Sequence, residues 1–304
     1  MKIASLLPSA TEIVYALGLG ADLIGVTDEC DFPSDAVTKP VICRSTLPHG
    51  RIQVPREIDQ IVRARAGQTA PPFLLDTDLL RREQPDVILT QDLGRVHVVP
   101  GGRVQRALDE LGLSNTDVLT LDPQTLEDVI ASIETVGTAL DRPDQASSLA
   151  ATLRARVAKV RETATRVPTV SVLALEWADP PFAAGHWVPE MIETVGGTSI
   201  LSMKGLPSRE TVWHEVRAAA PEVIVFMPSG SYLEEAEEEA DSFLEHPEFA
   251  DTPAARNGNV YAVDATSFFS RPGPRLVDGL EILAWAVHPD FYPAPPGGTI
   301  AKLG

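Results

Sequence analysis

The sequence has 304 residues and a formal net charge of −18 at pH 7; 44% of its residues are hydrophobic and 22% are charged. This composition is typical of a folded globular protein, and the length suits two domains better than one compact core. The negative charge argues against nucleic acid as a partner and against a polybasic membrane-surface role, because both require clustered Lys and Arg side chains.

The first half of the chain alternates short apolar segments with amphipathic ones. Strands are expected at residues 2–7, 23–27, 40–44, 86–90 and 118–121, and helices from Pro8, Leu79 and Val104. Ser9 and Glu12 have the spacing of a capping box at the start of the first helix. Strands that alternate with helices predict a parallel sheet with helices on its faces.

The second half repeats this plan, with strands expected at 169–175, 222–227 and 260–263 and a helix at 188–195. Gln84-Pro85-Asp86-Val87-Ile88-Leu89 is matched by Ala220-Pro221-Glu222-Val223-Ile224-Val225, so a helix–Pro–acid–strand unit occurs once in each half. The predicted fold class is therefore α/β, with two similar doubly wound lobes.

The predicted boundaries are an N-terminal lobe at 1–122, a helical connection at 123–168, a C-terminal lobe at 169–288 and a loose tail at 289–304. Pro143 suits the first position of a helix, and residues 144–166 contain no Gly or Pro. Such a helix would span roughly 30 Å and would restrict hinge motion between the lobes more than a flexible linker would.

Two features of the N-terminal region bear on the compartment and on metals. No secretory signal precedes the first strand, and no apolar run reaches the ~20 residues of a membrane helix, so the sequence as given predicts a cytoplasmic location. Cys30 and Cys43 are the only cysteines. We expect free thiols near the surface that folding does not require, and no metal site, because Glu29-Cys30-Asp31 has no further Cys or His at ligand spacing.

Ligands of open α/β sheets bind beyond the carboxyl ends of the strands. The candidate ligand-binding residues at such positions are Ser9, Glu29, Phe32, Arg44, Gln91, Trp177, Phe182, His186, Trp187, Phe269 and Arg271. Aromatic residues collect among them although they make up 6% of the chain, which suggests a large planar or cyclic ligand in a cleft between the lobes. Arg44, Gln91 and Arg271 would meet its polar groups or carboxylates.

Several of these residues have a plainer interpretation. Trp177 and Phe182 equally suit the interior of a lobe interface. His186 either ligates a metal or cofactor or forms a hydrogen bond within its loop. The acidic run Glu234–Asp241 is typical of a solvated helix face.

Two other function classes stay open at this point. The sequence contains no GxSxG, P-loop, HExxH or GxGxxG motif, so no catalytic residue is expected. An enzyme acting on a tetrapyrrole or another small cofactor would use Glu29, Asp92, Glu176 and His186. An interaction module would dock on its partner through its acidic helices.

The opening SLLPSATEIVYALGLGADLIGVTDECDFP resembles the vitamin B12-type periplasmic binding proteins of ABC importers, in the wider group that also binds iron siderophores and haem. The resemblance continues through QPDVILTQDL, LEWADPPFAAGHWVPEMIETVGG and FSRPGPRLVDGLEILAWAVHPD. It implies two lobes joined by a long bridging helix, as in helical-backbone metal receptors, with little closure on binding. It also implies a cobalamin-like corrinoid or a related tetrapyrrole or metal chelate as the ligand, no required cofactor, and an ABC importer permease as the partner.

The chain departs from this pattern at two positions. Asp28 stands where similar sequences often have His, and Gly94 and His97 stand where they often have cysteines. Any metal contact that those residues make elsewhere does not carry over to this chain.

Overall fold

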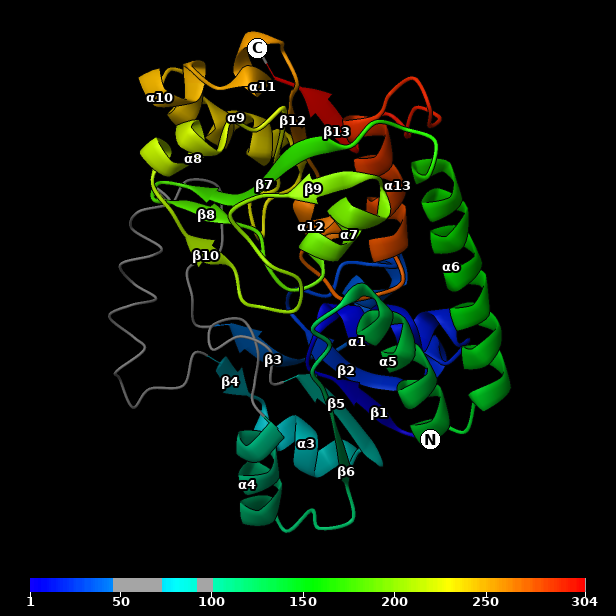
Figure 1. Cartoon of the computed structure of the whole chain (residues 1–304). Coiled ribbons are helices and arrows are strands. Elements are labelled where there is room, and N and C mark those ends of the chain that lie inside the picture. Colours follow the sequence, from blue (N-terminus) through cyan, green and yellow to red (C-terminus); the bar gives the residue numbers. More distant parts are fainter. Residues whose placement is uncertain (46–72, 92–100, 304) are drawn as a thin grey trace. The chain divides into compact units, whose positions relative to one another are not determined.

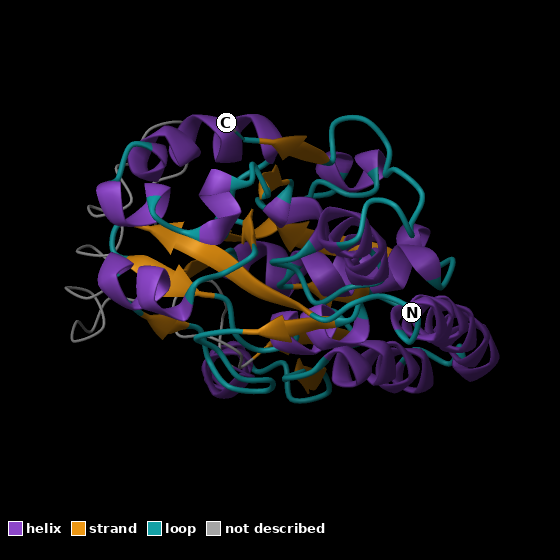
Figure 2. Cartoon of the chain, turned by 45° about the horizontal axis from the view of Figure 1, so that its top comes forward, coloured by secondary structure: helices purple, strands orange, loops and turns teal. Residues whose placement is uncertain are grey.

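The computed structural model describes residues 1–45, 73–91 and 101–303, which divide into two compact units (Figure 1). Of these residues, the N-terminal unit contains 1–45, 73–91, 101–123 and 129–151, and the C-terminal unit contains 124–128 and 152–303. Each unit is built from a β-sheet and helices, as the alternation of the sequence predicts (Figure 2).

The described part of the N-terminal unit has a six-stranded sheet in the order β4-β3-β2-β1-β5-β6. Its strands are β1 (Ile3–Ser5), β2 (Leu23–Thr27), β3 (Val41–Ser45), β4 (Phe73–Leu75), β5 (Val87–Gln91) and β6 (Asp117–Leu121). All neighbours pair in parallel except β3 and β4. Every residue of β1 and β5 is buried, as expected for central strands of a parallel sheet covered on both faces.

The helical elements of this unit's first part are α1 (Pro8–Ala16), η1 (Gly20–Asp22), η2 (Ser34–Thr38), α3 (Thr77–Glu83) and α4 (Gly101–Leu111). The predicted capping box of α1 is wrong. Leu7 is the N-cap, and it makes no side-chain capping bond. Because Pro8 has a fixed φ and no N–H group, it begins the helix itself, and Ser9 and Glu12 are buried inside it.

The described part of the C-terminal unit has a mixed seven-stranded sheet in the order β10-β8-β7-β11-β12-β13, with β9 also pairing with β7. Its strands are β7 (Val170–Ala178), β8 (Pro181–Ala183), β9 (Gly197–Ser199), β10 (Arg209–Glu210), β11 (Val223–Phe226), β12 (Val260–Val263) and β13 (Ile300–Lys302). The central strands β7, β11 and β12 are parallel. The tail predicted to be loose instead contributes β13, which pairs antiparallel with β12.

Helices of this unit are α7 (Val188–Thr194), α8 (Trp213–Ala219), α9 (Leu233–Leu244), α10 (Pro247–Ala250), α11 (Pro253–Arg256), α12 (Ala265–Phe268) and α13 (Leu276–Val287). Helix α9 carries the acidic run of the sequence. Ala236, Ala240 and Phe243 form its buried face, whereas Glu237 and Glu238 are exposed. The run is therefore a solvated helix face, as predicted.

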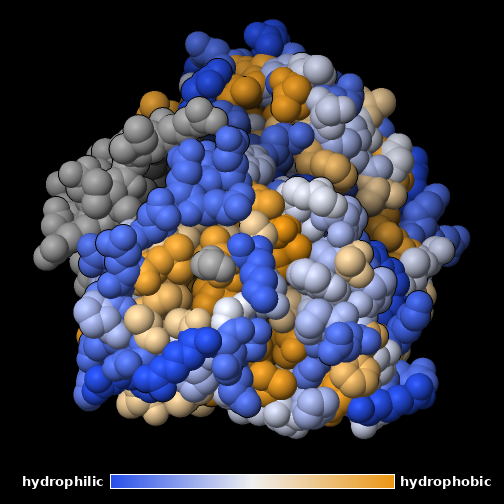
Figure 3. Space-filling model, turned by 90° about the horizontal axis from the view of Figure 1, so that it is seen from above, coloured by the Kyte–Doolittle hydropathy of each residue, from blue (hydrophilic) through white to orange (hydrophobic). Residues whose placement is uncertain are grey.

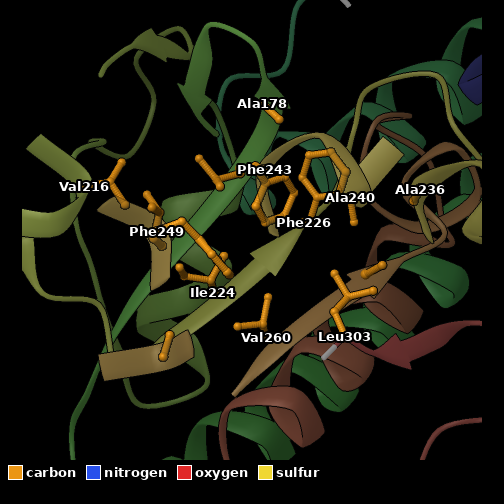
Figure 4. Close-up of a cluster of buried hydrophobic side chains, with 14 of the residues drawn as sticks. Ala178, Val216, Ile224, Phe226, Ala236, Ala240, Phe243, Phe249, Val260 and Leu303 are labelled. Atoms are coloured by element: carbon orange, nitrogen blue, oxygen red, sulfur yellow. The ribbon is translucent and has the colours of Figure 1, made fainter. Parts of the chain in front are cut away.

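Three phenylalanines pack against one another in the core beneath α9 (Figure 4). Phe243 packs edge to face against Phe226 of β11 and Phe249 of α10, with ring centroids 4.9 and 5.1 Å apart. Trp213 of α8 stacks on Phe243 at 5.6 Å. Elsewhere, hydrophilic residues cover much of the face seen in Figure 3, with hydrophobic residues between them.

The connection between the units contains α5 (Leu126–Ala139) and the long helix α6 (Pro143–Ala164), which begins at the predicted proline. Helix α6 starts in the N-terminal unit and ends in the C-terminal unit. In the C-terminal unit, Arg156 lies 2.6 Å from Asp278 and 2.7 Å from Glu281, two carboxylates of α13. Across the three described ranges, no helix is long and apolar enough to cross a membrane.

The helix–Pro–acid–strand repeat has the same hydrogen bonds in both units. Asp86 Oδ2 accepts a bond from the Lys2 N–H at 2.7 Å, and Glu222 Oε2 accepts one from the Ser171 N–H at 2.8 Å. The backbone returns each bond, from Asp86 N–H to the Lys2 carbonyl and from Glu222 N–H to the Ser171 carbonyl, both at 2.9 Å. Asp86 therefore holds the start of β5 beside β1, and Glu222 holds the start of β11 beside β7. The repeat in the sequence thus corresponds to a repeat in the structure.

Candidate functional site

Candidate residues of the N-terminal unit lie around the carboxyl edge of its sheet. Ser9 follows β1, Glu29 follows β2 and Gln91 ends β5, and these strands are parallel neighbours. Ser9 and Gln91 are buried, with 2% and 5% exposure, whereas Phe32 is 44% exposed. Arg44 was expected after β3 but lies within it, on an exposed position. Phe32 and Arg44 are thus the candidates of this unit with most surface to offer a ligand.

The loop after β2 is anchored by Cys30. Its Sγ lies 3.1 Å from Thr11 Oγ1 and 3.2 Å from Thr27 Oγ1. Both cysteines are free, but they are buried rather than near the surface, and burial raises the pKa of the Cys43 thiol to about 12. In the parts of the chain that the structure describes, no group of three or more His, Cys, Asp or Glu side chains is placed to hold a metal ion.

In the C-terminal unit the segment expected to be one long loop is partly a β-hairpin. Strand β7 continues through Glu176 and Trp177 and returns as β8, with Trp177 directly opposite Phe182. The register shifts between Leu175 and Trp177, so Glu176 lies at an irregularity in the pairing of the two strands. The sequence missed this hairpin because its antiparallel partner strand has only three residues and contains a proline.

Trp177 and Phe182 form a cross-strand aromatic pair at the end of this hairpin. Both side chains are half-buried. The indole Nε1 of Trp177 is buried and has no hydrogen-bond partner among the described residues. Because buried N–H groups are nearly always paired, this donor is suited to an acceptor that a ligand brings.

A second segment, residues 200–208, holds the turn that follows the hairpin. The His186 N–H donates to the Leu206 carbonyl at 2.6 Å, and the Gly205 N–H donates to the His186 carbonyl at 2.9 Å. The Gly185 N–H donates to Ser208 Oγ at 3.1 Å, and a Cβ added at Gly185 would overlap the backbone of residues 206–208. This segment, which we call the bracing loop, was not singled out from the sequence because its role depends on pairing with a distant turn.

The bracing loop also exposes apolar side chains. Met203 is 65% exposed and Leu206 is 47% exposed, although backbone hydrogen bonds fix the loop on both sides of them. Large apolar side chains that stay exposed on a loop held by backbone hydrogen bonds are typical of a binding surface.

His186 has a positive φ of 53°, and its Nδ1 lies 3.3 Å from Gln124 Oε1. That contact favours the hydrogen-bonded interpretation of this histidine. Gln124 belongs to the C-terminal unit although it precedes α5, so the sequence-based boundary at residue 169 does not include it.

Trp187 and Phe269 lie in the interior. They are 5% and 2% exposed, and the Trp187 Nε1 donates to the Phe269 carbonyl at 2.8 Å. This bond fixes the start of α7 to the segment after α12. Arg271, two residues further on, is half-buried.

Glu176 is the titratable group of this region whose pKa is moved most clearly. Burial raises its pKa to about 7, and the hydrogen bond from Ser208 acts in the opposite direction. Its partner in the enzyme alternative, Asp92, lies outside the described residues, as do Gly94 and His97. Glu29 and His186 lie in different units, so the described residues do not assemble that set within one unit.

The sequence matches a family model described as periplasmic binding protein over residues 3–266. It is 24% identical over 298 residues to YvrC of Bacillus subtilis, an uncharacterized ABC transporter substrate-binding lipoprotein, covering 96% of this chain and 81% of that protein. It is also 24% identical over 284 residues to the vitamin B12-binding protein of Vibrio cholerae, covering 92% and 86% of the two chains.

The structure is similar to that of a periplasmic heme-binding protein from Pseudomonas aeruginosa, with a TM-score of 0.72, 19% identity and coverage of 100% of this chain and 99% of that one. At this identity the likeness concerns the fold. These findings overturn the predicted cytoplasmic location, because the matched family is periplasmic and YvrC is a substrate-binding lipoprotein.

Proposed function

Because the chain belongs to the periplasmic binding protein family, we propose that it carries a corrinoid such as cobalamin, or a related tetrapyrrole or metal chelate, to an ABC importer. Members of this family are ligand carriers, so the chain is a binding protein and not an enzyme. The similarity to the vitamin B12-binding protein of Vibrio cholerae supports a corrinoid, and the likeness to the heme-binding protein keeps haem as the alternative ligand.

The observation that carries the proposal is the half-buried Trp177–Phe182 pair of the hairpin, in the same unit as the bracing loop that exposes Met203 and Leu206. A corrin or porphyrin ring is large, flat and mostly apolar, with polar substituents at its rim. The two aromatic rings match the macrocycle, and the Trp177 N–H, which has no hydrogen-bond partner among the described residues, matches an acceptor at the rim.

The other sequence-based candidates stay proposals for the same ligand. Phe32 offers an exposed ring, and Arg44, Gln91 and Arg271 would meet polar groups or carboxylates of the ligand. That the ligand lies between the two lobes also stays a prediction.

The experiment is titration of the purified protein with cyanocobalamin and with haemin, followed by calorimetry and by the visible spectrum of the ligand. Trp177→Ala should weaken binding about five- to a hundredfold, since burying an aromatic ring contributes about 1–3 kcal/mol. Trp177→Phe keeps a ring and removes the N–H, so its loss should be about fivefold.

The matched control is Trp213→Phe, which removes an indole from the phenylalanine core of the same unit. This control should bind as the wild type does. If the wild type binds neither probe, the proposed ligand class is wrong; if it binds one and both Trp177 variants bind equally well, the aromatic pair is not the contact surface.

A further inference from the structure

Glu190, on α7, contacts two other segments of the C-terminal unit through its carboxylate. Its Oε2 accepts a hydrogen bond from the Leu126 N–H at 2.8 Å, and its Oε1 lies 3.0 Å from Lys204 Nζ on the bracing loop. The side chain of Glu190 is 13% exposed, and that of Lys204 is 47% exposed. One largely buried carboxylate therefore joins α7, the first turn of α5 and the bracing loop.

The bond to Leu126 is made at the N-terminus of α5. Leu126 is the first residue of that helix, so its N–H group has no carbonyl partner within the helix. The adjacent Thr125 and Asp128 exchange bonds in the manner of a capping box, from the Thr125 N–H to Asp128 Oδ2 at 2.9 Å and from the Asp128 N–H to Thr125 Oγ1 at 3.2 Å. Because the N-terminus of a helix carries a partial positive charge, the Glu190 carboxylate is stabilised there.

Two further contacts join this first turn to the bracing loop and to the turn after the hairpin. His186 Nδ1 lies 3.3 Å from Gln124 Oε1, and a Cβ built on Gly205 would lie 3.8 Å from Thr125 Cγ2. The Gly205 N–H in turn donates to the His186 carbonyl at 2.9 Å. Residues 124–126 therefore support the bracing loop, and they belong to the same unit as that loop.

We propose that Glu190 is a positioning residue that holds the bracing loop, with its exposed Met203 and Leu206, on the first turn of α5. A ligand that contacts the loop then also stabilises the start of α5. The coupling to a ligand rests on the proposed function, whereas the positioning of the loop does not.

The two contacts of Glu190 have separable effects. An ion pair between partly exposed side chains adds little to stability, so breaking it should release the loop and leave the fold intact. A released loop must be ordered by the ligand, which lowers the affinity about two- to tenfold for each side chain that becomes fixed. Because such coupling is reciprocal, ligand binding to the wild type should slow hydrogen exchange of the Leu126 amide.

The first arm of the test measures amide hydrogen exchange in the full chain without ligand. Lys204→Met removes the ion pair and leaves the bond between Glu190 and Leu126. It should therefore speed exchange of the His186 and Gly205 amides, whose bonds join the turn to the loop, and leave the Leu126 amide unchanged. Glu190→Ala removes both contacts and should speed exchange at all three amides.

Two variants serve as controls in this arm. Lys204→Arg keeps the ion pair and should exchange as the wild type does. Glu193→Gln changes an exposed carboxylate on the same helix and should also match the wild type. If Lys204→Met leaves the His186 and Gly205 amides at the wild-type rates, the inference about the loop is overturned.

The second arm measures the affinity for cyanocobalamin or haemin, whichever the wild type binds, and repeats the exchange measurement with that ligand bound. Lys204→Met should lose about two- to tenfold in affinity together with the ligand-induced slowing at Leu126, and Lys204→Arg should retain both. A merely structural role for Glu190 would not connect the ligand to the Leu126 amide.

The outcomes of the second arm are distinguishable. Ligand-induced slowing at Leu126 that is as large in Lys204→Met as in the wild type overturns the coupling and leaves the proposed function standing. Failure of the wild type to bind either probe removes the proposed function, and the first arm still decides whether Glu190 positions the loop.

Discussion

The sequence-based assignment of the site and the structure disagree about the role of Trp187. The sequence analysis placed Trp187 against the ligand. In the structure its side chain is 5% exposed, and its Nε1 donates a hydrogen bond to the Phe269 carbonyl at 2.8 Å. Trp187→Ala should therefore lower the free energy of unfolding by about 3–5 kcal/mol, because the substitution leaves a cavity the size of an indole. Trp187→Phe retains most of the packing and loses the hydrogen bond, so its loss should be about 1–2 kcal/mol.

Urea unfolding followed by far-UV circular dichroism measures these losses, and ligand titration below the unfolding transition measures affinity. The comparison is Trp177→Ala, which removes a half-buried ring and should lose affinity with a smaller loss of stability. If Trp187→Ala unfolds at the wild-type urea concentration and loses affinity, the structural reasoning is refuted and Trp187 is a ligand contact.

Three further predictions concern folding and the buried groups. Asp86→Ala and Glu222→Ala should each cost about 1 kcal/mol in urea unfolding, since each acid caps the equivalent backbone N–H; a neutral result at either would break the proposed equivalence. Burial lowers the pKa of His288, so the unfolded chain takes up the proton first and stability should fall as the pH drops below about 6.5; a His288→Gln variant with the same acid profile would contradict this. In native protein, Cys30 and Cys43 should not react with DTNB, and reaction without denaturant would show that they are accessible.

The local elements were predictable because each is encoded in neighbouring residues. Strand β12 has the predicted bounds, and α6 begins at Pro143 as the proline's lack of an N–H group requires. The repeat at Asp86 and Glu222 was visible because the same junction of helix, proline, acid and strand recurs in the sequence.

The candidate site was less predictable, because its parts are brought together by partners that are distant in the chain. Nothing in the sequence predicts that residues 200–208 hold the turn at Gly185, because most of that contact is made through backbone atoms. The sequence analysis placed Glu176 after a strand, and only the pairing of its neighbours Leu175 and Trp177 with β8 shows that it lies within the strand, at a shift of register.

The sequence by itself determined the class of fold, the repeat of two α/β lobes and the long helix, since these follow from hydrophobic spacing and from glycine and proline positions. Tertiary structure alone decided which aromatic rings are buried and that residues 300–302 join the sheet as β13. Burial and strand pairing depend on contacts between segments that are distant in the chain, so neighbouring residues do not determine them. The sequence alone therefore does not distinguish an aromatic residue in the core, such as Trp187, from a half-buried one, such as Trp177.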